Sequence, residues 1–265
     1  MKIGNETIPR TGISTSDETS ITVRGKDLCS ELIGKISFTD YFLLLLTGQM
    51  PSPELTAVAD ATLVAIAEHG LVPSVQASRM TYAASPEALQ SAVAAGILGC
   101  GSVILGAAEE AGVLLHRVVE HSINSNLTIE SSAKEVLAQY KASGKKLPGY
   151  GHPLHKTGDP RVHALFDVAA NLKMDYRYIE AAEIIETLVP DFYKKPLRLN
   201  VSAAIPAVLL GAGFPVNALK GIPILARTGG LLAHLHEEAA KPIGFALSYQ
   251  ASRAAVYDEA ESEAD

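Results

Sequence analysis

Residues 144–159, Gly-Lys-Lys-Leu-Pro-Gly-Tyr-Gly-His-Pro-Leu-His-Lys-Thr-Gly-Asp, form the long irregular connection of a chain whose other segments have helical patterns. Gly149 and Gly151 free the backbone to approach a ligand closely, and His152 beside them can exchange a proton near neutral pH. Loops of this length inside helical proteins are usually functional. We therefore expect the chemistry of the protein in this loop.

Helix start signals recur on both sides of the loop. A capping side chain precedes a proline at Ser52-Pro53-Glu54, Ser85-Pro86-Glu87 and Asp159-Pro160-Arg161. Ser37 with Asp40 resembles a capping box, and Gly70 stands where a C-terminal cap would follow the helix that Pro53 opens. Further apolar patterns with helical spacing cover about 128–142, 161–173, 176–188, 201–212 and 215–240, without alternating runs of β-branched residues between hairpin turns. The sequence predicts an all-α fold.

Composition limits the class of protein. The 265 residues can bury a core as one large domain or as a large and a small one, and 48% of them are hydrophobic against 19% charged. A net charge of −7 argues against broad binding to nucleic acid or anionic membranes, which needs a surplus of Lys and Arg. Cys29 and Cys100 are too few for a disulfide framework, and the N-terminus has no signal-peptide pattern. We expect a folded cytoplasmic protein in which both cysteines are structural.

Residues 91–108 (SAVAAGILGCGSVILGAA) contain no charge and would pass a crude test for a membrane span. Their apolarity comes largely from alanine, with glycines at 96, 99, 101 and 106. Small residues at this density suit a helix packed closely against other helices. We predict a buried helix here.

Several side chains of the loop have more than one interpretation. Lys145 and Lys146 could meet phosphates, although two solvated loop lysines are at least as common. The spacing of His152, His155 and His163 would allow a metal site, but no carboxylate or thiolate is clearly placed to complete it. We expect no metal, and we take His155 and His163 as surface residues or supports of the site.

The stretch LPGYGHPLHKTGDPR (147–161) resembles the citrate synthase superfamily, in which Pro-Gly-Tyr/Phe-Gly-His is followed by the arginine of Asp-Pro-Arg. The resemblance covers most of the chain. Residues 21–52 look like the family's opening helices, EHGLVPSVQASR (68–79) like its substrate-binding histidine segment, and LARTGGLLAHLHEE (225–238) like its late arginine helix. GSVILGAAEEA, PLHKTGDPR and GFALSYQ are most similar to short citryl-CoA lyases.

The resemblance implies a role for each matching residue. His152 matches the histidine that exchanges a proton with the hydroxyl or carbonyl oxygen of the substrate. His69 matches the histidine that binds the oxaloacetate portion, Arg161 and Arg227 match arginines that bind carboxylates, and Lys241 stands where relatives often donate an arginine across a dimer interface. The loop whose backbone contacts the CoA adenine corresponds to Pro148, Gly149, Tyr150 and Gly151. Taken singly, each histidine or arginine could be an ordinary polar side chain, and Arg161 a helix-terminal ion-pair partner. Taken together at the family spacings, they favour a ligand site.

Two residues depart from the family pattern. Ile104 replaces the histidine of Gly-Pro-Leu-His-Gly, as an apolar residue commonly does in citryl-CoA lyases. Ser202 replaces the aspartate of Asn-Val-Asp, and Asp191 lies eleven residues too early to substitute for it. A serine is not a carboxylate base, so Ser202 can position a water, donate a hydrogen bond or make room for a larger acyl group.

The resemblance therefore implies a carbon–carbon lyase that acts on citryl-CoA or a related 3-hydroxy-3-carboxyacyl-CoA, with the CoA thioester as substrate and no permanently bound cofactor. Two alternatives stay open: another reaction on a CoA thioester, such as hydrolysis, and a CoA-binding partner subunit without activity. We expect a homodimer in which residues 1–108 and 212–265 form a large domain and residues 109–211 a small one. In relatives the active site lies at the seam between these domains.

Overall fold

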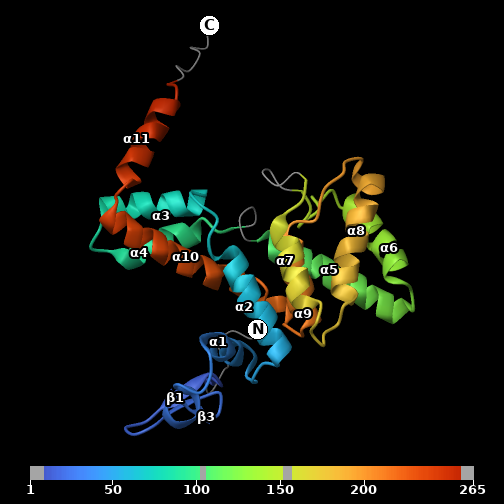
Figure 1. The fold of residues 1–265 in the computed structure, drawn as a ribbon, viewed down its shortest axis with the longest axis horizontal. Coiled ribbons are helices and arrows are strands. Elements are labelled where there is room, and N and C mark those ends of the chain that lie inside the picture. Colours follow the sequence, from blue (N-terminus) through green and yellow to red (C-terminus); the bar gives the residue numbers. More distant parts are fainter. Residues whose placement is uncertain (1–8, 102–105, 152–156, 258–265) are drawn as a thin grey trace. The chain divides into compact units, whose positions relative to one another are not determined.

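The computed structural model describes residues 9–101, 106–151 and 157–257, and these are mostly helical (Figure 1). The all-α prediction is confirmed. The α-helices are α1 (Phe38–Thr47), α2 (Pro53–Ala67), α3 (Pro73–Ala84), α4 (Leu89–Leu98), α5 (Ala107–Ser125), α6 (Ile129–Ala142), α7 (Pro160–Ala169), α8 (Arg177–Tyr193), α9 (Val201–Gly211), α10 (Gly221–Ala240) and α11 (Gly244–Ala254).

The chain divides into two compact units. Unit 1 contains residues 1–62 and 111–219, and unit 2 contains residues 63–110 and 220–265. The boundaries expected for a large and a small domain, after residues 108 and 211, stay a prediction. The residues predicted for the site are distributed over both units, so each unit is described separately.

Unit 1 contains a helical core. Helix α8 packs against α6 and α9, and α9 also packs against α7. Leucine and isoleucine side chains that are almost completely inaccessible to solvent fill this core, among them Leu114, Leu137, Ile185 and Leu209. Helix α9 is buried along its length except at Ser202, which is partly exposed. A buried helix with one partly exposed polar residue near its start is a good support for a ligand site.

Unit 1 also contains a small sheet that was not predicted from the sequence. Strands β1 (Ser14–Ser16), β2 (Ile21–Val23) and β3 (Lys26–Asp27) pair antiparallel in the order β1-β2-β3. The prediction that residues 21–52 begin with helix is wrong at this point. Arg24 and Gly25 both have positive φ, at 51° and 79°, and make the two-residue turn between β2 and β3.

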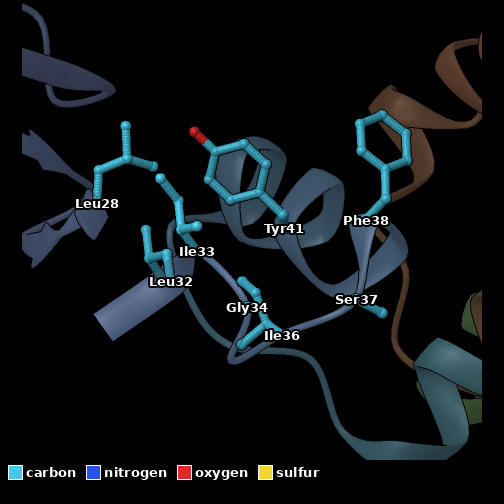
Figure 2. Close-up of a pocket in the computed structure, with 8 residues that line it drawn as sticks. All are labelled: Leu28, Leu32, Ile33, Gly34, Ile36, Ser37, Phe38 and Tyr41. Atoms are coloured by element: carbon cyan, nitrogen blue, oxygen red, sulfur yellow. The ribbon is translucent and has the colours of Figure 1, made fainter. Parts of the chain in front are cut away.

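A short π-helical turn (Leu28–Leu32) and α1 follow the sheet and enclose an apolar cluster with Val23 and Leu44. The capping box of Ser37 and Asp40 at the start of α1 is confirmed. Figure 2 shows a pocket beside this cluster, where Ile33 and Phe38 are largely exposed. The pocket contains none of the residues predicted for the site.

Unit 2 is built from α3, α4, α10 and α11, with α3 packed against the other three and α10 against α4 (Figure 1). Glycines allow the close approach of these helices. A Cβ at Gly96 of α4 would lie 2.7 Å from a methyl group of Leu231 in α10 and 3.0 Å from the carbonyl oxygen of Ser74 in α3. The tight packing expected from the small residues of this segment is therefore present at Gly96.

The single buried helix predicted over residues 91–108 is nevertheless wrong. Helix α4 ends at Leu98, only Ala92 and Gly96 of it are buried, and α5 begins at Ala107. Several glycines close together disfavour a continuous helix, which accounts for the break. None of the helices in the described residues has the length and apolarity needed to cross a bilayer.

Two predicted helix ends also differ from the structure. Ser85 is the C-cap of α3, where its backbone amide donates to the carbonyl of Thr81, and α4 begins only at Leu89. Helix α2 ends at Ala67, three residues before Gly70, because the Glu68 carboxylate turns back and accepts from the next two backbone amides. The starts of α2 and α7 are as predicted, after Ser52 and Asp159.

Candidate functional site

In unit 1, the loop 148–151 lies against the start of α9. The amide of Asn200 donates to the carbonyl of Gly149 at 3.0 Å, and the amide of Gly151 donates to the carbonyl of Arg198 at 2.6 Å. The Asn200 side chain donates to the carbonyl of Gly151 and accepts from the amide of Ser202, for which it is the helix cap. The loop and Ser202 are thus fixed by the same asparagine.

Glycine is required at position 149 for two reasons. Its φ is +82°, and a Cβ there would lie 2.5 Å from the Cβ of Ala203. Gly151, with φ +84°, also lies in the left-handed region that favours glycine. Pro148, Gly149 and Tyr150 are buried and Gly151 is partly exposed.

Tyr150 anchors the loop to α8. Its hydroxyl donates to the carbonyl of Ala182 in α8 at 2.9 Å, and burial raises the pKa of this phenol well above its usual value of 10. The phenol therefore stays protonated and acts as a structural donor.

Asp159 joins the loop to two helices. It caps α7 by accepting from the Arg161 amide, and its other oxygen accepts from the Val201 amide at the start of α9 at 3.0 Å. Burial alone would raise the pKa of Asp159, but hydrogen bonds from the Arg161 side chain and from both amides lower it to about 2. This buried carboxylate is charged at neutral pH.

Arg161 is the ion-pair partner of Asp159. Its Nε and Nη2 donate to the two carboxylate oxygens at 2.9 and 2.8 Å, while its side chain stays 20% exposed. In the structure, Arg161 therefore forms the helix-terminal ion pair that was one of its two interpretations from the sequence. A bound carboxylate could still approach the exposed edge of the guanidinium.

His152 and His155, like Ile104, lie outside the described residues. His163 is exposed on α7, and Lys145 and Lys146 are both exposed. Within the part of the chain that is described, no group of three His, Cys, Asp or Glu side chains is arranged to hold a metal ion.

In unit 2, the segment that carries His69 lies against α10. A Cβ at Gly230 would lie only 2.0 Å from the carbonyl oxygen of Ala67, so Gly230 allows the end of α2 to approach. Arg227 precedes Gly230 by three residues and therefore lies on the same face of α10. Lys241 is exposed directly after this helix.

Arg227 has the environment of a ligand-binding arginine. Only 4% of the residue is exposed, and its Nε and Nη1 are buried without a hydrogen-bond partner among the described residues. Buried charged donors without partners are costly. Arg227 lies close enough to Cys100 to oppose, by its charge, the burial that raises the pKa of this thiol. An anionic ligand would complete the hydrogen bonding of Arg227.

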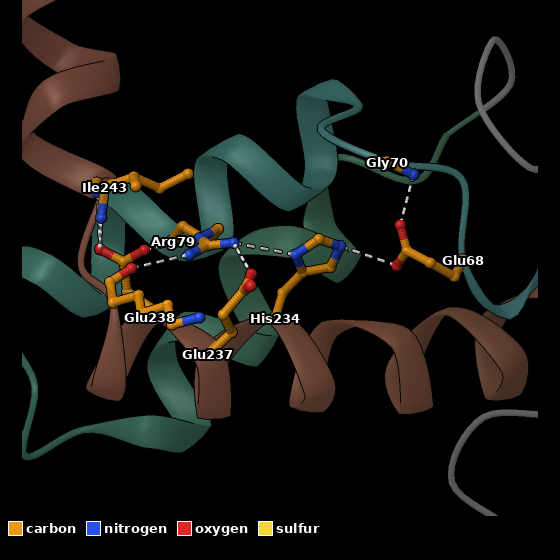
Figure 3. Close-up of polar contacts among 9 residues, drawn as sticks. Glu68, Gly70, Arg79, His234, Glu237, Glu238 and Ile243 are labelled. Carbon is orange, nitrogen blue, oxygen red and sulfur yellow. Dashed lines mark hydrogen bonds and ion pairs between the residues drawn. The ribbon is translucent and has the colours of Figure 1, made fainter.

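Unit 2 also contains a buried ion pair that was not predicted from the sequence. Arg79 of α3 is 2% exposed, and its Nε donates to Glu238 of α10 at 2.6 Å while its Nη1 donates to Glu237 at 2.7 Å (Figure 3). The other oxygen of Glu238 accepts from the amides of Ile243 and Gly244 at the start of α11. The sequence carries one signal of this pair. Arg79 lies four residues after Val75 on α3 and therefore shares a helical face with an apolar residue.

Comparison with known proteins identifies the family of this chain. The model of the citrate synthase C-terminal domain matches residues 11–244. The chain belongs to the citrate synthase family. It is 28% identical over 230 residues to the citrate synthase-like protein oryE of Aspergillus oryzae, and this match covers 82% of this chain and 49% of that protein. It is 30% identical over 210 residues to citrate synthase of Synechocystis sp., covering 77% of this chain and 50% of the relative. The chain thus spans about half the length of the curated relatives it matches.

Among solved structures, citryl-CoA lyase from Hydrogenobacter thermophilus matches with a TM-score of 0.81 and 29% identity, covering 97% of each chain. ATP citrate lyase from Methanosaeta concilii, solved in complex with (3S)-citryl-CoA, matches with a TM-score of 0.78 and 22% identity over 98% of this chain and 43% of that one. The second likeness concerns the fold alone. The chain has the citrate synthase fold.

Proposed function

We propose that this chain is a carbon–carbon lyase that cleaves citryl-CoA, or a related 3-hydroxy-3-carboxyacyl-CoA, to acetyl-CoA or another acyl-CoA and oxaloacetate or another 2-oxo acid. The observation that carries the proposal is the match with the Hydrogenobacter citryl-CoA lyase over almost the full length of both chains. The curated citrate synthases are matched over only about half of their length. The short lyase is therefore the better guide to activity.

In the proposed reaction, His152 removes the proton of the substrate hydroxyl. The bond between the hydroxyl carbon and the methylene carbon of the thioester then breaks, and the hydroxyl carbon becomes the carbonyl of the 2-oxo acid. The electron pair passes to the thioester enolate, which takes a proton from water. Positioned general acid–base groups typically contribute about 10²- to 10⁴-fold, so a serine in place of the family's aspartate slows this last step without abolishing it.

The remaining residues bind the substrate in this proposal. The backbone of Pro148, Gly149, Tyr150 and Gly151 contacts the CoA adenine. His69, Arg161, Arg227 and Lys241 bind the carboxylate-bearing acyl group, a task that suits the two-pronged guanidinium of arginine. Among the residues that the structure describes, Nε and Nη1 of Arg227 have no hydrogen-bond partner, and this supports the assignment most directly because a carboxylate would satisfy both.

The experiment that tests the proposal is product analysis. Purified protein is incubated with citryl-CoA, and the products are identified by mass spectrometry. We expect acetyl-CoA and oxaloacetate in equal amounts, and almost complete loss of turnover when His152→Ala is introduced. Citrate and free CoA without oxaloacetate would assign a hydrolase instead, and binding without turnover would favour a partner subunit.

A further inference from the structure

His234 of α10 lies between two charged side chains of unit 2 (Figure 3). Its Nδ1 is 3.3 Å from Nη1 of Arg79, and its Nε2 is 2.8 Å from Oε2 of Glu68. The second contact is close without the alignment of a regular hydrogen bond. The imidazole side chain is only 14% exposed, so both of its nitrogens face protein groups and not bulk water.

The Arg79 guanidinium that faces His234 is held from three sides. Glu238 and Glu237 accept from its Nε and Nη1, and the carbonyl oxygen of Lys241 accepts from its Nη2 at 3.3 Å. Arg79 and Glu238 are both 2% exposed. Buried pairs of this kind have little freedom to rearrange, because either charge alone would be costly.

Arg79 fixes the protonation pattern of His234. A guanidinium donates and never accepts, so Nδ1 of His234 must be the acceptor and carries no proton. The proton of the neutral imidazole is therefore on Nε2, which faces the Glu68 carboxylate. Arg79 thus decides which edge of His234 is presented to Glu68.

Glu68 in turn shapes the backbone at His69. Its Oε1 accepts from the amide of His69 at 2.9 Å and from the amide of Gly70 at 2.5 Å. Gly70 has φ +73°, a conformation that the chain adopts here to bring both amides to one oxygen. Because the Glu68 side chain is 47% exposed, water would compete for its oxygens if His234 did not hold it.

We propose that His234 is a positioning residue for His69: by holding Glu68 it fixes the backbone from which the substrate-binding histidine projects. The inference rests on the proposed role of His69 in binding the oxaloacetate portion. A small displacement of a positioned group can cost up to about 100-fold. We expect about a tenfold loss in affinity for oxaloacetate when His234 is removed, since the histidine remains but is held less firmly.

The test compares His234→Ala, His234→Gln and His236→Ala. Glutamine can present an N–H toward Glu68, and His236 is an exposed histidine two residues along the same helix, which makes its variant a matched control. Oxaloacetate and CoA binding are measured by calorimetry, and thermal unfolding is recorded for each variant. His234→Ala should weaken oxaloacetate binding about tenfold with CoA binding within about twofold of the original protein. His234→Gln should recover most of the loss, and His236→Ala should change neither.

Unchanged oxaloacetate binding in His234→Ala would overturn the inference, as would no recovery in His234→Gln. An equal loss for both ligands with a lowered melting temperature would also overturn it, because that pattern indicates a general structural role. His69→Ala separates this inference from the proposed function. If His69→Ala abolishes oxaloacetate binding and His234→Ala does not weaken it, only the role of His234 fails. If the original protein does not bind oxaloacetate at all, both fail.

Discussion

A single buried carboxylate, Asp159, connects the starts of α7 and α9 and the side chain of Arg161. Its pKa of about 2 is below the ordinary value of 3.8, because burial, which raises it, is outweighed by the hydrogen bonds it accepts. A carboxylate with a lowered pKa stabilises the folded state above its unfolded pKa, and this stability is lost as the pH falls toward the folded pKa. The difference corresponds to about 2 kcal/mol.

We therefore predict that the contribution of Asp159 to the free energy of unfolding decreases by about 2 kcal/mol as the pH falls from about 4 to about 2. At pH 7, Asp159→Asn should lower the free energy of unfolding by a similar amount. In this variant the loss of stability between about pH 4 and about pH 2 should be smaller by the contribution of Asp159. Denaturant unfolding at several pH values measures both. Asp191→Asn, an exposed substitution on α8, is the control and should leave the pH profile unchanged. The same profile in Asp159→Asn as in the original protein would contradict the prediction.

Ser202 is the partly exposed residue of a buried helix, and the resemblance to the family implies an aspartate at its position. We predict that Ser202→Asp accelerates cleavage of citryl-CoA by about tenfold or more, because the enolate carbon gains a positioned acid. Ser202→Ala, which adds no carboxylate, is the control and should change the rate little. Single-turnover kinetics on citryl-CoA measure the effect. A lower rate in Ser202→Asp with intact CoA binding would mean that the serine itself contacts the acyl group or a water, and that citryl-CoA is not the substrate.

Among the elements, the loop 148–151 and the start of α9 are in close contact through their backbones. We predict that Gly149→Ala weakens CoA binding about tenfold, because an added methyl group would force the loop away from Ala203. Gly144→Ala is the matched control, since Gly144 has a similar φ of +71° but open space around its Cβ position. Both variants should lose about 1 kcal/mol of stability from the left-handed backbone. Equal CoA affinity in the two variants would show that the contact with Ala203 does not matter.

Local signals account for most of the elements that the sequence predicted. The capping box at Ser37 and the Asp159-Pro160 start of α7 involve residues close in the chain, so their geometry follows from local chemistry. The hairpin at Arg24-Gly25 was missed because arginine rarely adopts positive φ, and the turn depends on it. The short strands on either side also gave too little alternation to be recognised.

The candidate site was predictable only where a motif marks it. The loop 148–151 and Arg227 were predicted from residue type and resemblance, and the structure adds the backbone contacts of the loop and the burial of Arg227. Arg79 and Glu238 are 159 residues apart, so no local pattern could pair them. The same holds for Glu68 and His234, whose contact depends on the packing of α10 against the end of α2.

In the whole molecule, α11 packs against α3 but leaves most of its side chains exposed. Only Gly244 of this helix is buried, while Phe245 and Tyr249 are 69% and 62% exposed. Helices this short are marginal in water without packing on one face. We predict that a second copy of the chain covers α11 in a homodimer.

Light scattering at micromolar concentration should give twice the mass of the 27.9 kDa chain. The double variant Phe245→Ser with Tyr249→Ser should shift the protein toward the monomer, because it removes the exposed aromatic area. Gln250→Ala, on the same helix, is the control and should remain dimeric. A monomeric mass for the original protein would contradict the prediction.

We propose that the chain breaks a carbon–carbon bond of a CoA thioester and leaves an enolate that solvent protonates. Citryl-CoA cleavage in D₂O, followed by mass spectrometry of the acetyl-CoA formed, tests this most directly. We expect acetyl-CoA with one deuterium in its methyl group, together with oxaloacetate. Release of citrate and free CoA, with no deuterated acetyl-CoA, would contradict it.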